Sequence, residues 1–128
     1  MNYKASPDEA LKKLLEENEF PRPDDLSMNE SVGHTVGRAF TVMMKHGSMT
    51  IEYFAPQEID TQSPHKQDEI YVIIKGHATF YRDTEKASCK KGDILFVPAG
   101  MEHHFENFSD DFAVWVIFYG PDGGEKNV

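Results

Sequence analysis

The chain has 128 residues, of which 39% are hydrophobic and 27% charged, a composition typical of one soluble globular domain. Its formal net charge of −9 argues against nucleic-acid and membrane partners, because an acidic surface repels phosphates and anionic lipids. No apolar run approaches the roughly 20 residues that span a membrane, and the N-terminus lacks the apolar core of a signal peptide. With a single cysteine, Cys89, no intrachain disulfide can form, so we expect a cytoplasmic protein.

The first predicted element is a helix over residues 7–18. Ser6 suits the N-cap, Pro7 the first helical position, and Glu9 completes a capping box. An apolar stripe follows at helical spacing: Ala10, Leu11, Leu14 and Leu15. This stripe predicts that the helix packs against the rest of the protein.

After a proline-rich acidic arm at 20–30, the chain consists of short β-rich segments. They are residues 38–45, 48–55, 69–76, 78–83, 93–100, 103–108 and 112–120. The polar stretch 82–93 is interpreted as a turn. Many short strands without helices between them predict an all-β antiparallel sandwich or barrel. We therefore expect a helix and arm at 1–30, a β-barrel at 31–121 and a flexible tail at 122–128.

The last predicted strand is apolar on both faces. Phe112, Val114, Val116 and Phe118 alternate with Ala113, Trp115, Ile117 and Tyr119. One face can fill the barrel. The other face needs a second cover, which is either the N-terminal helix or another subunit. Together with the arm, this pattern predicts a homodimer.

Two stretches of the chain carry the polar residues of a candidate site. In 63–76, alternation places Ser63, His65, Gln67, Glu69 and Tyr71 on one face. In 92–107, it places His103, Phe105 and Asn107 on one face and His104 and Glu106 on the other. If the two strands lie side by side, His65, Glu69 and His103 form one inward-facing set. Without His103, we would interpret His65 and Glu69 as polar residues at the start of an ordinary strand.

Both stretches resemble the motifs of small single-domain cupins. The second family motif, G-x5-P-x-G-x2-H-x3-N, is matched by Gly92, Pro98, Gly100, His103 and Asn107. The first, G-x5-H-x-H-x3,4-E-x6-G, is matched by His65, Glu69 and Gly76. It departs from the family pattern at Gln57, in place of a glycine, and at Ser63, in place of a histidine. The resemblance covers about residues 38–120.

This resemblance implies a double-stranded β-helix, that is, a jelly-roll barrel, with one divalent metal per subunit. The implied metal ligands are His65, Glu69 and His103. Ser63 leaves one position open, which water, substrate, Gln67 or Gln62 could fill. Two imidazoles and one carboxylate suit Fe, Mn, Ni, Co or Zn and suit Ca poorly.

The function implied is a metal-binding cupin that acts on a small organic molecule as an oxygenase, isomerase or lyase. Tyr71 and Gln67 lie on the ligand face and are candidates for catalytic proton transfer or substrate orientation. Two alternatives stay open: a non-catalytic module that binds or senses a small ligand, and a barrel that has lost its metal.

Overall fold

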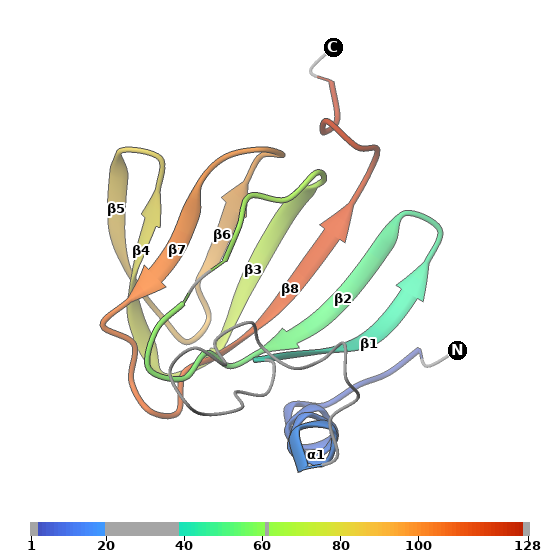
Figure 1. The fold of residues 1–128 in the computed structure, drawn as a ribbon, viewed down its shortest axis with the longest axis vertical. Helices are drawn as coiled ribbons and strands as arrows, with labels where there is room; N and C mark the ends of the chain where they lie inside the picture. The colour runs from blue at the N-terminus through green and yellow to red at the C-terminus, as the bar shows by residue number, and fades with distance from the viewer. Residues whose placement is uncertain (1–2, 20–38, 61, 127–128) are drawn as a thin grey trace, which may run out of the picture.

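The computed structural model describes residues 3–19, 39–60 and 62–126. The described residues form one helix, α1 (Pro7–Glu19), followed by strands (Figure 1). The strands are β1 (Phe40–His46), β2 (Met49–Phe54), β3 (Asp68–Lys75), β4 (His77–Arg82), β5 (Glu85–Lys90), β6 (Ile94–Val97), β7 (His103–Glu106) and β8 (Ala113–Tyr119). The predicted all-β class with a short N-terminal helix is confirmed. The arm predicted at 20–30 lies outside the described residues.

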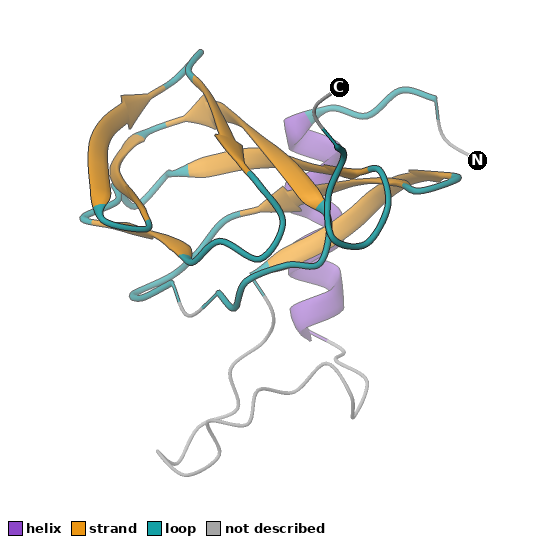
Figure 2. Cartoon of the chain, turned by 90° about the horizontal axis from the view of Figure 1, so that it is seen from above, coloured by secondary structure: helices purple, strands orange, loops and turns teal. Residues whose placement is uncertain are grey.

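The strands form two antiparallel sheets that face each other (Figure 2). One sheet has the order β1-β2-β8-β3-β6, and the other has the order β5-β4-β7. Neighbours in each sheet are mostly far apart in the sequence, as in a jelly roll. The last predicted strand, β8, lies at the centre of the larger sheet between β2 and β3.

The main core fills the space between the two sheets. Phe112, Val114, Val116 and Phe118, the predicted inner face, all belong to it. Its centre is aromatic, since the ring of Phe105 lies 5.0 Å from that of Tyr71 and 5.1 Å from that of Phe80. The contact between Phe105 and Tyr71 is edge-to-face, an arrangement that adds stability beyond area burial.

The helix α1 covers part of the outer face of the larger sheet. Ser6 Oγ accepts a hydrogen bond from the Glu9 amide at 3.2 Å, as the predicted capping box requires. Ala10 and Leu14 are buried in a second cluster with Tyr53 and Ala113. The cover that β8 needs on its outer face is therefore supplied in part by this helix. Within the described chain, no helix has the length and apolarity needed to cross a membrane.

The interpretation of residues 82–93 as a turn is wrong. Only a short turn at 83–84, with Asp83 in the left-handed region at a φ of 56°, separates β4 from β5. All six residues of β5 pair with β4, and the first four pair as Glu85↔Arg82, Lys86↔Tyr81, Ala87↔Phe80 and Ser88↔Thr79. These four are exposed, and only Cys89 is buried, so this edge strand is held by backbone pairing and carries almost no hydrophobic pattern.

Close packing around Gly76, the last glycine of the first motif, leaves no room for a side chain at this position. Its φ of 80° lies in the left-handed region. A Cβ here would clash with Ser109 Oγ and lie 2.8 Å from the Cα of Phe112. The glycine therefore lets the β3–β4 turn pack directly against the segment that leads into β8.

Candidate metal centre

Three metal-ligating side chains converge inside the barrel. Glu69 projects from β3, His103 is the first residue of β7, and His65 precedes β3. Their candidate ligand atoms all lie within 4.8 Å of one another. The two motif strands do not lie side by side, because β3 and β7 belong to different sheets. The residues meet because the inner faces of the two sheets oppose each other.

The contact between Glu69 and His103 leaves two buried atoms without a hydrogen-bond partner. His103 Nε2 lies 2.8 Å from Glu69 Oε1, and both side chains are at most 1% exposed. His103 Nδ1 lies 2.9 Å from the carbonyl oxygen of Met101, to which only a protonated nitrogen can donate. In the neutral ring, Nε2 then presents a lone pair to a carboxylate. Neither Nε2 nor Glu69 Oε2 has a hydrogen-bond partner among the described residues.

The two histidines differ in basicity. Burial acts to lower the pKa of His103, but the adjacent carboxylate of Glu69 outweighs it and raises that pKa. For His65, burial dominates over the attraction of Glu69, and the pKa is lowered. The His65 ring is therefore neutral at pH 7 and offers a lone pair, which is the form that binds metal.

A network of backbone hydrogen bonds positions His65. The expected strand alternation over 63–67 does not exist, because β3 begins only at Asp68. Instead, the amide of Gly100 in the second motif donates to the carbonyl oxygen of His65 at 2.7 Å. The Asp68 carboxylate accepts hydrogen bonds from the amides of Ala99 and Glu125 at 2.9 and 2.8 Å. The second motif therefore supplies one ligand, His103, and also the turn that holds another.

The same contacts fasten the start of the C-terminal segment. Besides the Glu125 amide, the Gly123 amide donates to the carbonyl oxygen of Lys66 at 2.7 Å. Residues 127–128 lie outside the described chain. The flexibility predicted for 122–128 stays a prediction.

The candidates for a fourth ligand are placed differently from one another. Ser63 is exposed, whereas Gln62 reaches inward and its Oε1 accepts a hydrogen bond from the Tyr71 hydroxyl at 2.7 Å. The Nε2 of Gln67 donates to the carbonyl oxygens of Ser48 and Gly120 at 2.8 and 2.9 Å. Both amides therefore already make hydrogen bonds.

Asp60 is a positioning residue that no sequence motif indicates. Its Oδ2 accepts from Gln62 Nε2 at 2.7 Å and from the Phe105 amide at 2.8 Å. These bonds fix which end of the Gln62 amide faces Tyr71. Burial and the charge of Glu69 raise the pKa of Tyr71 well above 10, so its hydroxyl stays protonated at neutral pH.

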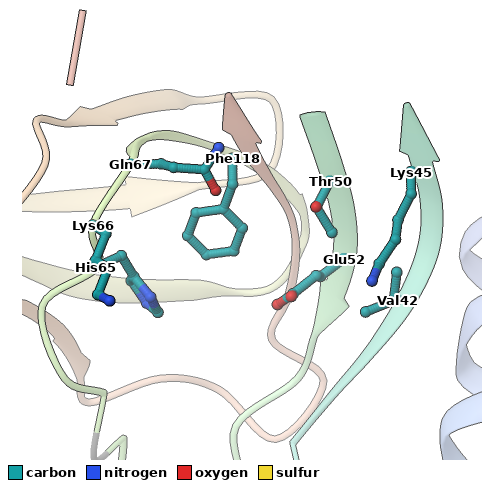
Figure 3. A pocket seen from close by; sticks show the side chains of 8 residues that line it. All are labelled: Val42, Lys45, Thr50, Glu52, His65, Lys66, Gln67 and Phe118. Carbon is teal, nitrogen blue, oxygen red and sulfur yellow. The ribbon is translucent and has the colours of Figure 1, made fainter. Parts of the chain in front are cut away.

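Two openings flank the three ligands. One has a volume of about 250 Å3 and is lined by His65 and by residues of β1, β2 and β8 (Figure 3). The other, of about 420 Å3, is lined by His103 and by three acidic residues: Asp60, Glu102 and Glu106. His104, expected on the opposite face from His103, is half-buried, borders the same opening and stacks on Tyr81 at 4.9 Å. The three ligands can thus be approached from two sides of different charge.

The donor set fits a divalent transition metal. Buried polar atoms are normally paired, so an unpaired Nε2 facing a carboxylate lone pair fits either a shared proton or a cation-binding position. Two imidazoles and one carboxylate match the ligand preference of Fe, Mn, Co, Ni and Zn. The hydrogen bond from Nδ1 of His103 to Met101 is the supporting contact that metal-bound histidines commonly make.

Comparison with known proteins places the chain in a family. Residues 50–119, more than half of the chain, match the model of the Cupin domain family, so the chain belongs to the cupins. It is 31% identical over 86 residues to an uncharacterized protein of Streptomyces coelicolor, covering 66% of this chain and 82% of that protein. The predicted family and its double-stranded β-helix fold are confirmed.

Two further relatives are more distant. An acireductone dioxygenase of Pseudomonas syringae is 26% identical over 103 residues, which span 68% of this chain and 57% of that enzyme. The crystal structure of a cupin 2 conserved barrel domain protein from Salinispora arenicola superposes with a TM-score of 0.54 at 19% identity. The superposition covers 63% of this chain and 74% of that one. At this identity, the structure supports the fold alone.

Proposed function

We propose that the protein is a metal-dependent cupin enzyme acting on a small organic molecule. The observation that carries the proposal is the buried contact of Glu69 with His103, which leaves Nε2 and Oε2 unpaired beside His65. The similarity to an acireductone dioxygenase supports an oxygenase over an isomerase or lyase. The reaction type and the substrate are part of the proposal.

His65, Glu69 and His103 would hold one divalent ion. Such an ion would supply Lewis-acid chemistry, and redox chemistry if it is iron or manganese. Three protein ligands leave open positions, as a catalytic site needs. The ring of His65 packs against other aromatic rings, at 4.7 Å from Phe118 and 5.6 Å from His103, which limits how it can turn.

Tyr71 would act as a hydrogen-bond donor. Its raised pKa keeps the proton on the hydroxyl, and Gln62 and Asp60 fix the direction in which it points. Because a phenol has one proton, Tyr71 would stabilise negative charge that develops on a substrate oxygen only when that oxygen replaces Gln62 Oε1 as its acceptor. Gln67 would orient substrate through its Oε1, because its Nε2 already donates to two backbone carbonyls.

The test begins with elemental analysis of the purified protein and of His103→Ala. We expect about one metal per chain in the parent and a large loss in the variant, with the far-UV circular dichroism spectrum unchanged. His104→Ala is the matched control, because His104 follows His103 on β7 but stacks on Tyr81 and is not one of the three candidate ligands. Full metal occupancy in His103→Ala would place the metal elsewhere. The iron-loaded protein is then screened for oxygen uptake with candidate substrates.

A second candidate function is non-catalytic binding of a small ligand. It is favoured by the hydrogen bonds of Gln67, because both N–H groups of its side-chain amide already donate to backbone carbonyls and not to a substrate. Ligand binding without turnover, under every metal tested, would support this alternative. Loss of bound metal without loss of ligand binding would support it further.

We also propose a homodimer, since Ile94 and Phe96 on β6 are 70% and 45% exposed. Light scattering should give twice the mass of 14.6 kDa, and Phe96→Glu should give the monomer. A monomeric parent protein at micromolar concentration would refute this. The cytoplasmic location expected from the sequence stays a prediction.

A further inference from the structure

We propose that the opening beside His65 binds a small molecule with one anionic group, recognised by Lys45 and Lys66. This inference rests on the proposed function, because it assigns the substrate class of the same centre. It is carried by where these two lysines lie, by the charge difference between the two openings and by the size of the pocket.

The two lysines come from separate parts of the fold and meet at one pocket. Lys45 projects from β1, and Lys66 follows His65 directly in the chain. Figure 3 shows His65 and Lys66 on one side of the Phe118 ring and Lys45 on the other. A ligand in this pocket would touch the exposed edge of the metal centre and could reach both ammonium groups.

The charged residues that line the opening beside His65 favour a negatively charged ligand. The described residues that line this opening include two lysines and one carboxylate, Glu52, so their formal charges sum to +1. The opening on the His103 side carries three carboxylates and no lysine or arginine among its described lining residues. On a protein with a net charge of −9, the lysine-lined side is thus a local exception that attracts an anion. The acidic side repels an anion.

The pocket also limits the size and the charge of the ligand. Its volume of about 250 Å3 lies below the roughly 300–1,000 Å3 of sites for drug-sized molecules. Glu52 in the same wall opposes a polyanion. Thr50 and Gln67 line the pocket as well and offer polar contacts for a hydroxyl group. A small hydroxy acid therefore matches the pocket better than a neutral sugar, a cation or a polyphosphate.

The experiment uses the zinc-loaded 128-residue chain and two small probes, the anionic glycolate and the neutral glycolamide. Binding is followed by the backbone amide shifts of Lys66 and Gln67 in an NMR titration. We expect glycolate to bind at least about tenfold more tightly than glycolamide. The double variant Lys45→Gln/Lys66→Gln should weaken glycolate by roughly threefold to tenfold, as exposed ion pairs do, and leave glycolamide unchanged.

The control is Glu102→Gln, which removes one charge at the other opening and should leave both affinities within about twofold. Raising the salt from about 0.05 to about 0.5 M should weaken glycolate binding to the parent and barely affect the double variant. Equal affinity for both probes, or an unchanged glycolate affinity in the zinc-loaded double variant, would overturn this inference. Failure of the parent protein to hold zinc would overturn the proposed function instead, and zinc content is measured first.

Discussion

The Nε2 atom of His103 lies 2.8 Å from Oε1 of Glu69, although the two residues belong to strands of different sheets. Their side chains are almost fully buried, and His103 already uses Nδ1 to bind the Met101 carbonyl. A lone pair held against a carboxylate in the core is unfavourable without a shared proton or a cation. This contact therefore motivates the first prediction.

Glu69→Gln should abolish metal-dependent stabilisation and leave the metal-free protein at least as stable as the parent. The glutamine amide can donate to His103 Nε2, and one buried charge is removed. In the parent, metal at 100 times its dissociation constant should stabilise the fold by about 2.7 kcal/mol. Thermal unfolding with chelator and with cobalt checks both statements. A cobalt-induced rise in Tm that persists in Glu69→Gln would contradict the assignment of this ligand.

Gln62→His should raise metal affinity by about tenfold or more, whereas Ser63→His should leave it unchanged. Gln62 points inward to the Tyr71 hydroxyl, and Ser63 is exposed, although Ser63 occupies the position of the family's first histidine. Competition with a chelator measures both affinities. A gain in Ser63→His alone would show that the loop before β3 places Ser63, and not Gln62, toward the metal.

Tyr71→Phe should lower the free energy of unfolding by about 1–2 kcal/mol and leave metal stoichiometry unchanged. The substitution deprives Gln62 Oε1 of its donor inside the protein. The double variant with Gln62→Leu should cost less than the sum of the single changes, because the partners act together. Urea denaturation gives the free energies. Strict additivity would mean that this hydrogen bond does not couple the two residues.

Leu14→Ala should lower the free energy of unfolding by about 2–4 kcal/mol, because Leu14 is 4% exposed between α1 and the larger sheet. Leu15→Ala is the matched control: this neighbour is 59% exposed and should change stability by less than about 0.5 kcal/mol. Chemical denaturation measures both. Equal effects would show that the helix presents a different face to the sheet.

The thiol of Cys89 should resist alkylation in the folded protein up to alkaline pH. Burial, with a contribution from the charge of Asp93, raises its pKa to about 11. The folded state thus holds this proton more tightly than the unfolded state. This difference in proton affinity stabilises the folded state fully below the ordinary thiol pKa of about 8.5–9. The stabilisation is lost as the pH rises through the folded-state pKa of about 11. Iodoacetamide labelling followed by mass spectrometry tests this. Rapid labelling of folded protein at pH 8 would disprove it.

The amino-acid sequence alone determined the elements with strong local signals. The helix follows from the S-x-x-E box and the leucine stripe, and the inner face of β8 follows from strict alternation of large apolar residues. The matched residues of the two motifs identify the family and point to three candidate metal ligands, His65, Glu69 and His103. These signals are local in the chain, so they can be read without knowledge of distant contacts.

The tertiary structure decided what depends on contacts between distant segments. The strand β5 has almost no apolar pattern, since backbone pairing with β4 holds it at the sheet edge. The residues of the candidate site meet across two facing sheets, and His65 reaches it from a loop held by Gly100. The positioning role of Asp60 and the role proposed for Lys45 both depend on neighbours that the fold brings together. Hydrogen bonds and charges that act through space leave no periodic pattern in the sequence.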